Sequence, residues 1–163
     1  MNRTKRTIHR ALLRVFRRLP TRLRIAAVHL LSPSYTVGAM CVIERPDGAV
    51  LYVRHSYRPR WGVPGGLSRS GEDVADAARR EVAEEAGVAV VLLGEPAVVV
   101  DPGERRVDIV YAARLADGVD PATAVPVSPE IVECRWFPAG ERPELQRETA
   151  QALAALDRRA GTA

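Results

Sequence analysis

A glycine-rich turn that leads straight into an acidic segment is the feature that most constrains how this chain can fold. The turn lies within Trp61-Gly62-Val63-Pro64-Gly65-Gly66, where the glycines supply the backbone freedom that a tight turn needs. Residues 73–86 follow without a proline or glycine, and Gly87 stands where a helix often takes its C-cap. The sequence therefore predicts a tight turn followed by a helix over 73–86.

Three carboxylates fall on one face of this predicted helix. Glu81, Glu84 and Glu85 are spaced i, i+3 and i+4, which places them within one helical turn. Like charges repel, and an acidic helical face is most often only a solvated surface. Oxygen ligands at this spacing also suit Mg²⁺, which binds through a few carboxylates and keeps waters that a phosphate can replace. The spacing alone leaves both interpretations open.

The residues around the three carboxylates favour the second interpretation. The chain resembles the signature of the Nudix hydrolases, the Nudix box, at every specified position of residues 66–88: Gly66, five residues, Glu72, seven residues, Arg80-Glu81-Val82, one residue, Glu84-Glu85, one residue, Gly87-Val88. At ordinary residue frequencies a chance match is on the order of 10⁻⁹ per starting position. The lead-in at 61–66 also resembles the family, and a looser resemblance extends over about 35–158.

The resemblance implies both a fold and a reaction. The family fold is α+β, an α/β/α sandwich with a mixed sheet. The implied reaction is hydrolysis of a pyrophosphate bond by water attacking phosphorus, and it requires Mg²⁺, with Mn²⁺ as an alternative. The implied substrate is a nucleoside diphosphate linked to another group: an ADP-ribose-like compound, a nucleotide sugar, a dinucleotide or a (d)NTP. A pyrophosphate is strongly anionic, so cations must lie between it and the acidic cluster.

The resemblance also assigns roles by position. The implied metal ligands are Glu81, Glu84, Glu85 and a backbone carbonyl of Gly65 or Gly66. Glu72 and Arg80 match the supporting pair of the box. Arginine cannot ligate a cation, but its planar fork can brace a carboxylate and lower local repulsion, so we assign Arg80 an orienting role. Glu72 is left as either a metal contact or a support.

The general base that activates water has two candidates. Glu81 is one of them. Glu130 is the other, because many Nudix proteins carry an acidic residue before a strand similar to the one that ends in Trp136-Phe137. An exposed loop glutamate is an equally good interpretation of Glu130, so the identity of the base stays open.

A basic and aromatic cluster before the box is the candidate substrate site. It comprises Arg54, Tyr57, Arg58 and Arg60. Arginine forks recognise phosphate by paired hydrogen bonds, and a tyrosine ring can stack on a base or ribose. His55 is interpreted as structural, and Trp61 as packing beneath the box. The group attached to the diphosphate stays open: Pro102 lies near the place where a proline marks ADP-ribose-type members, yet 101–103 is also a plain turn.

The remaining chain mixes strands and helices without βαβ regularity, which predicts an α+β fold with a mixed sheet. Residues 35–44 and 49–55 are predicted to form a hairpin through Pro46-Asp47-Gly48. Further elements are predicted as strands over 89–93, 96–100, 106–114 and 131–137 and a closing helix over 143–159. Residues 34–163 should therefore form one hydrolase domain.

Residues 1–33 are predicted to form a separate basic arm. They hold nine of the chain's 24 Lys and Arg residues and none of its 20 Asp and Glu residues. Apolar residues recur at helical steps over 7–19, which predicts an amphipathic helix that Pro20 breaks or kinks. We expect its apolar stripe to pack on the domain or on a second copy, as in a homodimer. An anionic membrane surface and a nucleic acid are the alternative partners.

Two further features bear on compartment and class. Cys41 and Cys134 cannot form a disulfide framework, and the apolar run 25–31 is far shorter than the roughly 20 residues of a membrane span. We therefore expect a cytoplasmic enzyme that acts on a small diphosphate. One rival interpretation is a Nudix-like binding or regulatory module without turnover, against which the intact box argues. The other is a membrane- or nucleic-acid-associated protein whose basic arm sets its role.

Overall fold

The computed structural model describes residues 13, 16–32 and 34–161. By its internal contacts the chain divides into two compact units, Met1–Tyr35 and Thr36–Ala163, and each unit is described by itself. Within the described part of the chain, no helix is long and apolar enough to cross a membrane.

The first unit contains the helix α2 (Thr21–Leu31), which starts directly after Pro20. The sequence analysis missed α2, because its apolar residues do not follow one helical stripe. Leu23 and Ile25 are about half exposed and Leu30 is almost fully exposed. The helix predicted over 7–19 lies mostly outside the described residues, of which 13 and 16–18 are helical. The partner of the arm therefore stays a prediction.

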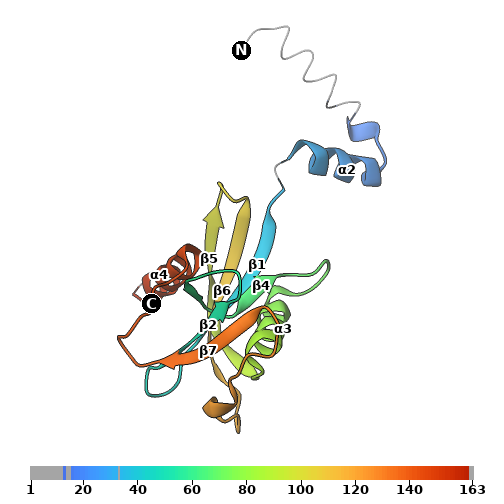
Figure 1. The fold of residues 1–163 in the computed structure, drawn as a ribbon. Coiled ribbons are helices and arrows are strands. Elements are labelled where there is room, and N and C mark those ends of the chain that lie inside the picture. The colour runs from blue at the N-terminus through green and yellow to red at the C-terminus, as the bar shows by residue number, and fades with distance from the viewer. Residues whose placement is uncertain (1–12, 14–15, 33, 162–163) are drawn as a thin grey trace. The chain divides into compact units, whose positions relative to one another are not determined.

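The second unit contains two sheets and two long helices, which Figure 1 labels. The first sheet has the order β4-β1-β6-β5, formed by Gly65–Leu67, Thr36–Ile43, Arg106–Leu115 and Val90–Asp101. In it β1 and β6 run parallel and the other neighbours antiparallel. The second sheet has the order β3-β2-β7, formed by Trp61–Gly62, Val50–His55 and Ile131–Phe137. The helices are α3 (Val74–Ala86), α4 (Arg147–Ala160) and the short 3-10 helix η1 (Pro121–Thr123).

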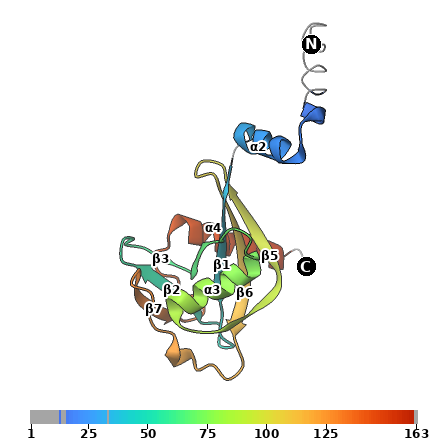
Figure 2. The same ribbon diagram turned by 90° about the vertical axis from the view of Figure 1, so that its right-hand side faces the viewer.

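Strand β1 shows why helices cover both faces of the first sheet. Residues 38–43 are all buried, which is the pattern of a strand that is covered on both sides. Because alternate side chains point to opposite faces, Cys41 packs in one cluster with Val82 of α3, whereas Met40 packs in another with Leu153 of α4. Figure 2 shows α3 and α4 on opposite sides of the strands. The prediction of an α+β fold with a mixed sheet is confirmed.

The predicted hairpin of β1 and β2 is wrong, although its turn is present. Gly48 N–H donates to Arg45 O at 2.8 Å, and one antiparallel bridge joins Glu44 to Val50. Beyond that bridge the strands separate, because β1 pairs with β4 and β6 whereas β2 pairs with β3 and β7. The turn therefore carries the chain from one sheet to the other.

Two other predicted boundaries need correction. The strands predicted over 89–93 and 96–100 are a single strand, β5, with a register shift between Leu93 and Ala97. Helix α4 begins at Arg147 rather than at 143. The residues before it are extended, since Trp61 N–H donates to Glu144 O and Gln146 N–H donates to Trp61 O. This pairing holds the start of α4 against β3, beside the candidate site.

Both cysteine thiols are expected to resist alkylation in the folded protein. Burial raises the pKa of Cys41 to about 12 and that of Cys134 to about 11. Because only the thiolate reacts, we expect iodoacetamide at pH 8 to label native Cys134 about a hundredfold and native Cys41 about a thousandfold more slowly than in denaturant. Intact-mass spectrometry over time measures this. Labelling of the native protein at the denatured rate would contradict the structure.

Candidate active site

Helix α3 and strand β4 together form the framework of the candidate site. Asp73 caps α3 by accepting from Ala75 N–H, and Gly87 ends the helix in the left-handed conformation at φ 70°. In β4, Gly65 pairs with Met40 and Gly66 pairs with Ala39 of β1. The tight turn predicted within 61–66 is therefore wrong, because the glycines of this stretch lie in the strands β3 and β4. The bond from Gly65 N–H to Glu85 Oε2, at 3.1 Å, joins β4 to the acidic helix.

The two glycines of β4 are needed for different reasons. A Cβ on Gly65 would lie 2.5 Å from Ala39 O, so the close approach of two backbones requires glycine there. A Cβ on Gly66 would lie 2.5 Å from Cδ of Glu81. The absence of a side chain at Gly66 therefore lets the Glu81 carboxylate lie directly against β4.

Arg80 is the centre of an ion-pair network. Its Nε and Nη2 donate to the two oxygens of Glu72 at 2.7 and 2.9 Å. Its Nη1 donates to Glu81 Oε1 at 2.6 Å and to Glu84 Oε2 at 3.0 Å. The hydrogen bonds from Arg80 lower the pKa of Glu72 to about 2. Arg80 therefore contacts three carboxylates at once.

Glu85 is the most enclosed of the three carboxylates on α3. It is 6% exposed, and its Oε2 accepts from Gly65 N–H at 3.1 Å. Its Oε1 lies 3.3 Å from His55 Nε2. Glu84 is about half exposed and also accepts from Arg69 Nη2 at 3.1 Å. Glu81 and Glu84 therefore share Arg80 Nη1 as a donor, whereas Glu85 lies against Gly65 and His55.

Burial and the neighbouring carboxylates both raise the pKa of Glu81. Burial raises its pKa, the bond from Arg80 lowers it, and the charges of Glu85 and Glu84 raise it further. No group of three or more His, Cys, Asp or Glu side chains within the described residues is gathered closely enough to hold a metal ion. Since Glu81 and Glu84 bond to Arg80 and Glu85 bonds to Gly65, the predicted ligand set is not preassembled. Its oxygen donors on one helical face nevertheless match a hard cation in type.

The predicted substrate cluster separates into two parts. Arg54 Nε and Nη2 donate to Glu133 Oε2 of β7 at 3.2 and 2.9 Å, and Arg60 Nε donates to Glu144 Oε1 at 2.8 Å. Trp61 packs edge-on against Phe137 of β7, with ring centroids 5.1 Å apart. Arg54 and Arg60 are therefore engaged by acidic partners that lie far away in the sequence.

Tyr57 and Arg58 form the part of the cluster that lies beside His55. The Tyr57 ring lies 5.4 Å from the ring of His55, and Arg58 Cζ lies 5.8 Å from the Tyr57 ring centroid. Burial raises the pKa of Tyr57, and the charge of Glu130 and a hydrogen bond from Tyr57 to it raise that pKa further. Glu130 thus lies beside Tyr57, on the same side as His55 and Glu85.

His55 and Gln146 are site residues that the sequence reasoning did not identify. His55 was interpreted as structural. Gln146 belongs to no motif, and it lies 91 residues from His55 in the chain. Gln146 is 8% exposed, and its Nε2 lies 3.4 Å from His55 Nδ1. Only the pairing of β3 with the residues before α4 brings them together.

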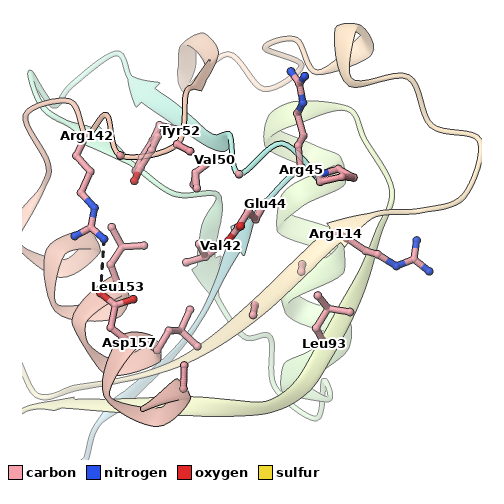
Figure 3. A pocket seen from close by; sticks show the side chains of 18 of the residues that line it. Val42, Glu44, Arg45, Val50, Tyr52, Leu93, Arg114, Arg142, Leu153 and Asp157 are labelled. Atoms are coloured by element: carbon pink, nitrogen blue, oxygen red, sulfur yellow. Dashed lines mark ion pairs between the residues drawn. The ribbon is translucent and has the colours of Figure 1, made fainter.

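A separate cavity of about 880 Å³ lies between α4 and strands β1, β2, β5 and β6 (Figure 3). Val42, Tyr52 and Leu153 line it, and the ion pair of Arg142 with Asp157, at 3.6 Å, closes one side. None of the candidate site residues lines this cavity. The candidate site is therefore the open surface around α3, β4 and the loop after β2.

Comparison with known proteins assigns this arrangement to a family. The model of the NUDIX domain matches residues 34–156. The chain is 41% identical over 69 residues to the Mus musculus protein "Nucleoside diphosphate-linked moiety X motif 6", a match that covers 42% of this chain and 21% of the mouse protein. It is 32% identical over 101 residues to the Bacillus subtilis (strain 168) protein "Putative 8-oxo-dGTP diphosphatase", covering 58% of this chain and 68% of that protein.

A solved structure gives the same result for the fold. The NUDIX hydrolase from Nitrosomonas europaea superimposes with a TM-score of 0.66 at 27% identity, covering 80% of this chain and 75% of that chain. The family match covers most of the chain and contains every residue of the box. The chain therefore belongs to the Nudix hydrolases, enzymes that act on diphosphate bonds.

Proposed function

We propose that this protein hydrolyses the pyrophosphate bond of a nucleoside diphosphate linked to another group, in a Mg²⁺-dependent reaction in which water attacks phosphorus. The observation that carries the proposal is the Glu81 carboxylate lying against Gly66, with Glu84 and Glu85 on the same face of α3. When bound, the cation supplies neutralisation of the diphosphate and activation of water. Mn²⁺ is an alternative to Mg²⁺.

The residues of the chain divide the remaining work. The proposed metal ligands are Glu81, Glu84, Glu85 and a carbonyl of Gly65 or Gly66. Arg80, braced by Glu72, offsets the repulsion among the carboxylates and orients Glu81 and Glu84. The base is Glu81 or Glu130. If the base is Glu130, replacing Glu130 with glutamine should lower kcat and leave the affinity for metal unchanged. Replacing a metal ligand would weaken metal binding as well.

Substrate binding is proposed for the loop after β2. Tyr57 is 62% exposed and can stack on a base or ribose, and Arg58 can bind a phosphate oxygen. Arg54, Arg58 and Arg60 would each first have to exchange present bonds for substrate, to Glu133, to Gln146 and Glu148, and to Glu144 respectively. We therefore rank Tyr57 above the three arginines as a substrate contact.

A substrate screen tests the proposal. The panel contains ADP-ribose, dinucleoside polyphosphates, NADH, nucleotide sugars, (d)NTPs including 8-oxo-dGTP, and prenyl diphosphates, each with Mg²⁺, with Mn²⁺ and with EDTA. We expect release of phosphate or nucleotide from at least one nucleotide in the presence of metal and none with EDTA. No turnover of any compound, together with a nucleotide-induced rise in Tm, would instead support a binding module.

The basic arm is tested separately by salt. Residues 1–33 carry nine positive charges and no negative charge, so binding of the full-length chain to anionic liposomes or RNA should weaken steeply as salt rises. Co-sedimentation across salt, with Arg17 and Arg18 replaced by glutamine as the matched variant, measures this. Association that persists at high salt and gives a dimer in light scattering indicates packing on a second copy instead.

A further inference from the structure

A chain of polar side chains reaches Glu85 from outside the Nudix box. Arg58 Nη1 donates to Gln146 Oε1 at 2.9 Å, and Gln146 Nε2 donates to Arg60 O at 3.0 Å. Gln146 Nε2 also lies 3.4 Å from His55 Nδ1, and His55 Nε2 lies 3.3 Å from Glu85 Oε1. The side chains of His55 and Glu85 are 11% and 8% exposed, so these contacts lie away from bulk water.

The direction of each hydrogen bond in this row of side chains follows from the groups at its two ends, Arg58 and the carbonyl of Arg60. Arg58 can only donate, so Gln146 must present its oxygen to Arg58. The carbonyl of Arg60 can only accept, so the amide nitrogen of Gln146 lies on the other side, toward His55. His55 Nδ1 is then the acceptor, and the single hydrogen of a neutral imidazole is on Nε2, the atom that faces Glu85.

We infer that His55, held in this tautomer by Gln146, is a positioning residue for Glu85. Two neutral donors, His55 Nε2–H and Gly65 N–H, hold one carboxylate oxygen each and leave a further lone pair on each oxygen for a cation. A buried carboxylate needs such donors, and donors behind a metal ligand fix its orientation. The inference rests on the proposed role of Glu85 as a metal ligand.

The rest of the fold holds Gln146 in place. Its backbone N–H donates to Trp61 O at 2.8 Å, which fixes the residue before α4 against β3. A Cβ on Gly62 would lie 3.2 Å from Gln146 Nε2, so Gly62 leaves the space that the amide occupies. The position of the His55 ring therefore depends on the start of α4 as well as on β2.

Binding of Mn²⁺ alone, measured by electron paramagnetic resonance without substrate, tests the inference. We expect His55→Phe to raise the Kd for Mn²⁺ about tenfold or more, as loss of a supporting donor typically does. His55→Gln places an amide N–H near the position of Nε2 and should restore the affinity to within a few-fold, whereas His55→Asn reaches only the position of Nδ1 and should not. A purely structural role of the ring would not distinguish glutamine from asparagine.

The outcomes separate this inference from the proposed function. If Glu85→Gln weakens Mn²⁺ binding and His55→Phe does not, the positioning role is wrong and the metal site stands. If the wild-type protein binds no Mn²⁺, the proposed metal site fails and the inference fails with it. ¹⁵N NMR of the wild-type chain, with His55→Gln for assignment, gives a second readout that does not depend on metal affinity. It should show His55 protonated at Nε2 alone at pH 8, and protonation at Nδ1 would overturn the inference.

Discussion

Replacing Glu85 with glutamine should lower kcat/KM by at least about a hundredfold, or about 2.7 kcal/mol of transition-state stabilisation. The substitution keeps the size of the side chain and an oxygen that can accept from Gly65 N–H, but it removes the charge proposed to hold the cation. The negative charge of Glu85 repels that of Glu81 and raises its pKa. Since the substitution removes this repulsion, the variant should fold as well as the wild-type protein. The measurement is steady-state kinetics on the substrate found in the screen, together with Tm.

The matched control for this prediction is Glu95→Gln. Glu95 is an exposed glutamate at the irregular part of β5, and it has no role in the proposed site. The Glu95→Gln variant should change kcat/KM by less than twofold. Equal turnover of Glu85→Gln and the wild-type protein would refute the assignment of Glu85, and equal loss in both variants would show that net charge alone is responsible.

The substitution Gly65→Ala should destabilise the fold by about 3 kcal/mol, the upper part of the usual range for forced overpacking. The added Cβ would lie 2.5 Å from Ala39 O and 2.9 Å from Met40 Cα. Both atoms belong to the backbone of a buried central strand, so neither can move aside without breaking its pairing. Urea denaturation followed by circular dichroism measures the change in the free energy of unfolding.

Gly66→Ala is the matched variant, because it differs in what the new methyl group meets. At Gly66 the Cβ would lie 2.5 to 2.6 Å from the carboxylate atoms of Glu81, which are the flexible end of a side chain. We expect the fold to keep its stability to within about 1 kcal/mol while the displaced carboxylate lowers kcat/KM at least about tenfold. A stable Gly65→Ala together with an unfolded Gly66→Ala would contradict the arrangement of β4 between β1 and α3.

The sequence predicted the site helix well and the pairing of strands poorly, for one physical reason. Helix α3 is specified by local signals, namely its spacing of carboxylates and its final glycine, and these need no knowledge of the rest of the chain. Strand partners are not local: the turn at 46–48 looked like a hairpin, but β1 pairs with β6 instead. Residues 89–93 and 96–100 were predicted as two strands, yet β5 runs through both with a register shift between Leu93 and Ala97.

The candidate site shows the same limit at the level of side chains. Arg54, Arg58 and Arg60 are close in sequence and looked like one cluster, but each is engaged by a partner 79 to 88 residues away. Gln146 offered no pattern to detect, since its importance arises from the pairing of 144–146 with Trp61. Sequence reasoning thus reached the residues within the box and missed the groups that the fold brings to them.

The parallel pairing of β1 with β6 has a consequence for biosynthesis. β1 ends at Ile43 and β6 begins at Arg106, so more than sixty residues separate two strands that must lie side by side. Contacts between distant segments form late, because the intervening loop must first close. A nascent chain that has emerged only as far as α3 therefore carries its acidic helix without the central sheet that supports it. Ribosome-bound intermediates of this protein should gain protease resistance only after Leu115 has left the exit tunnel.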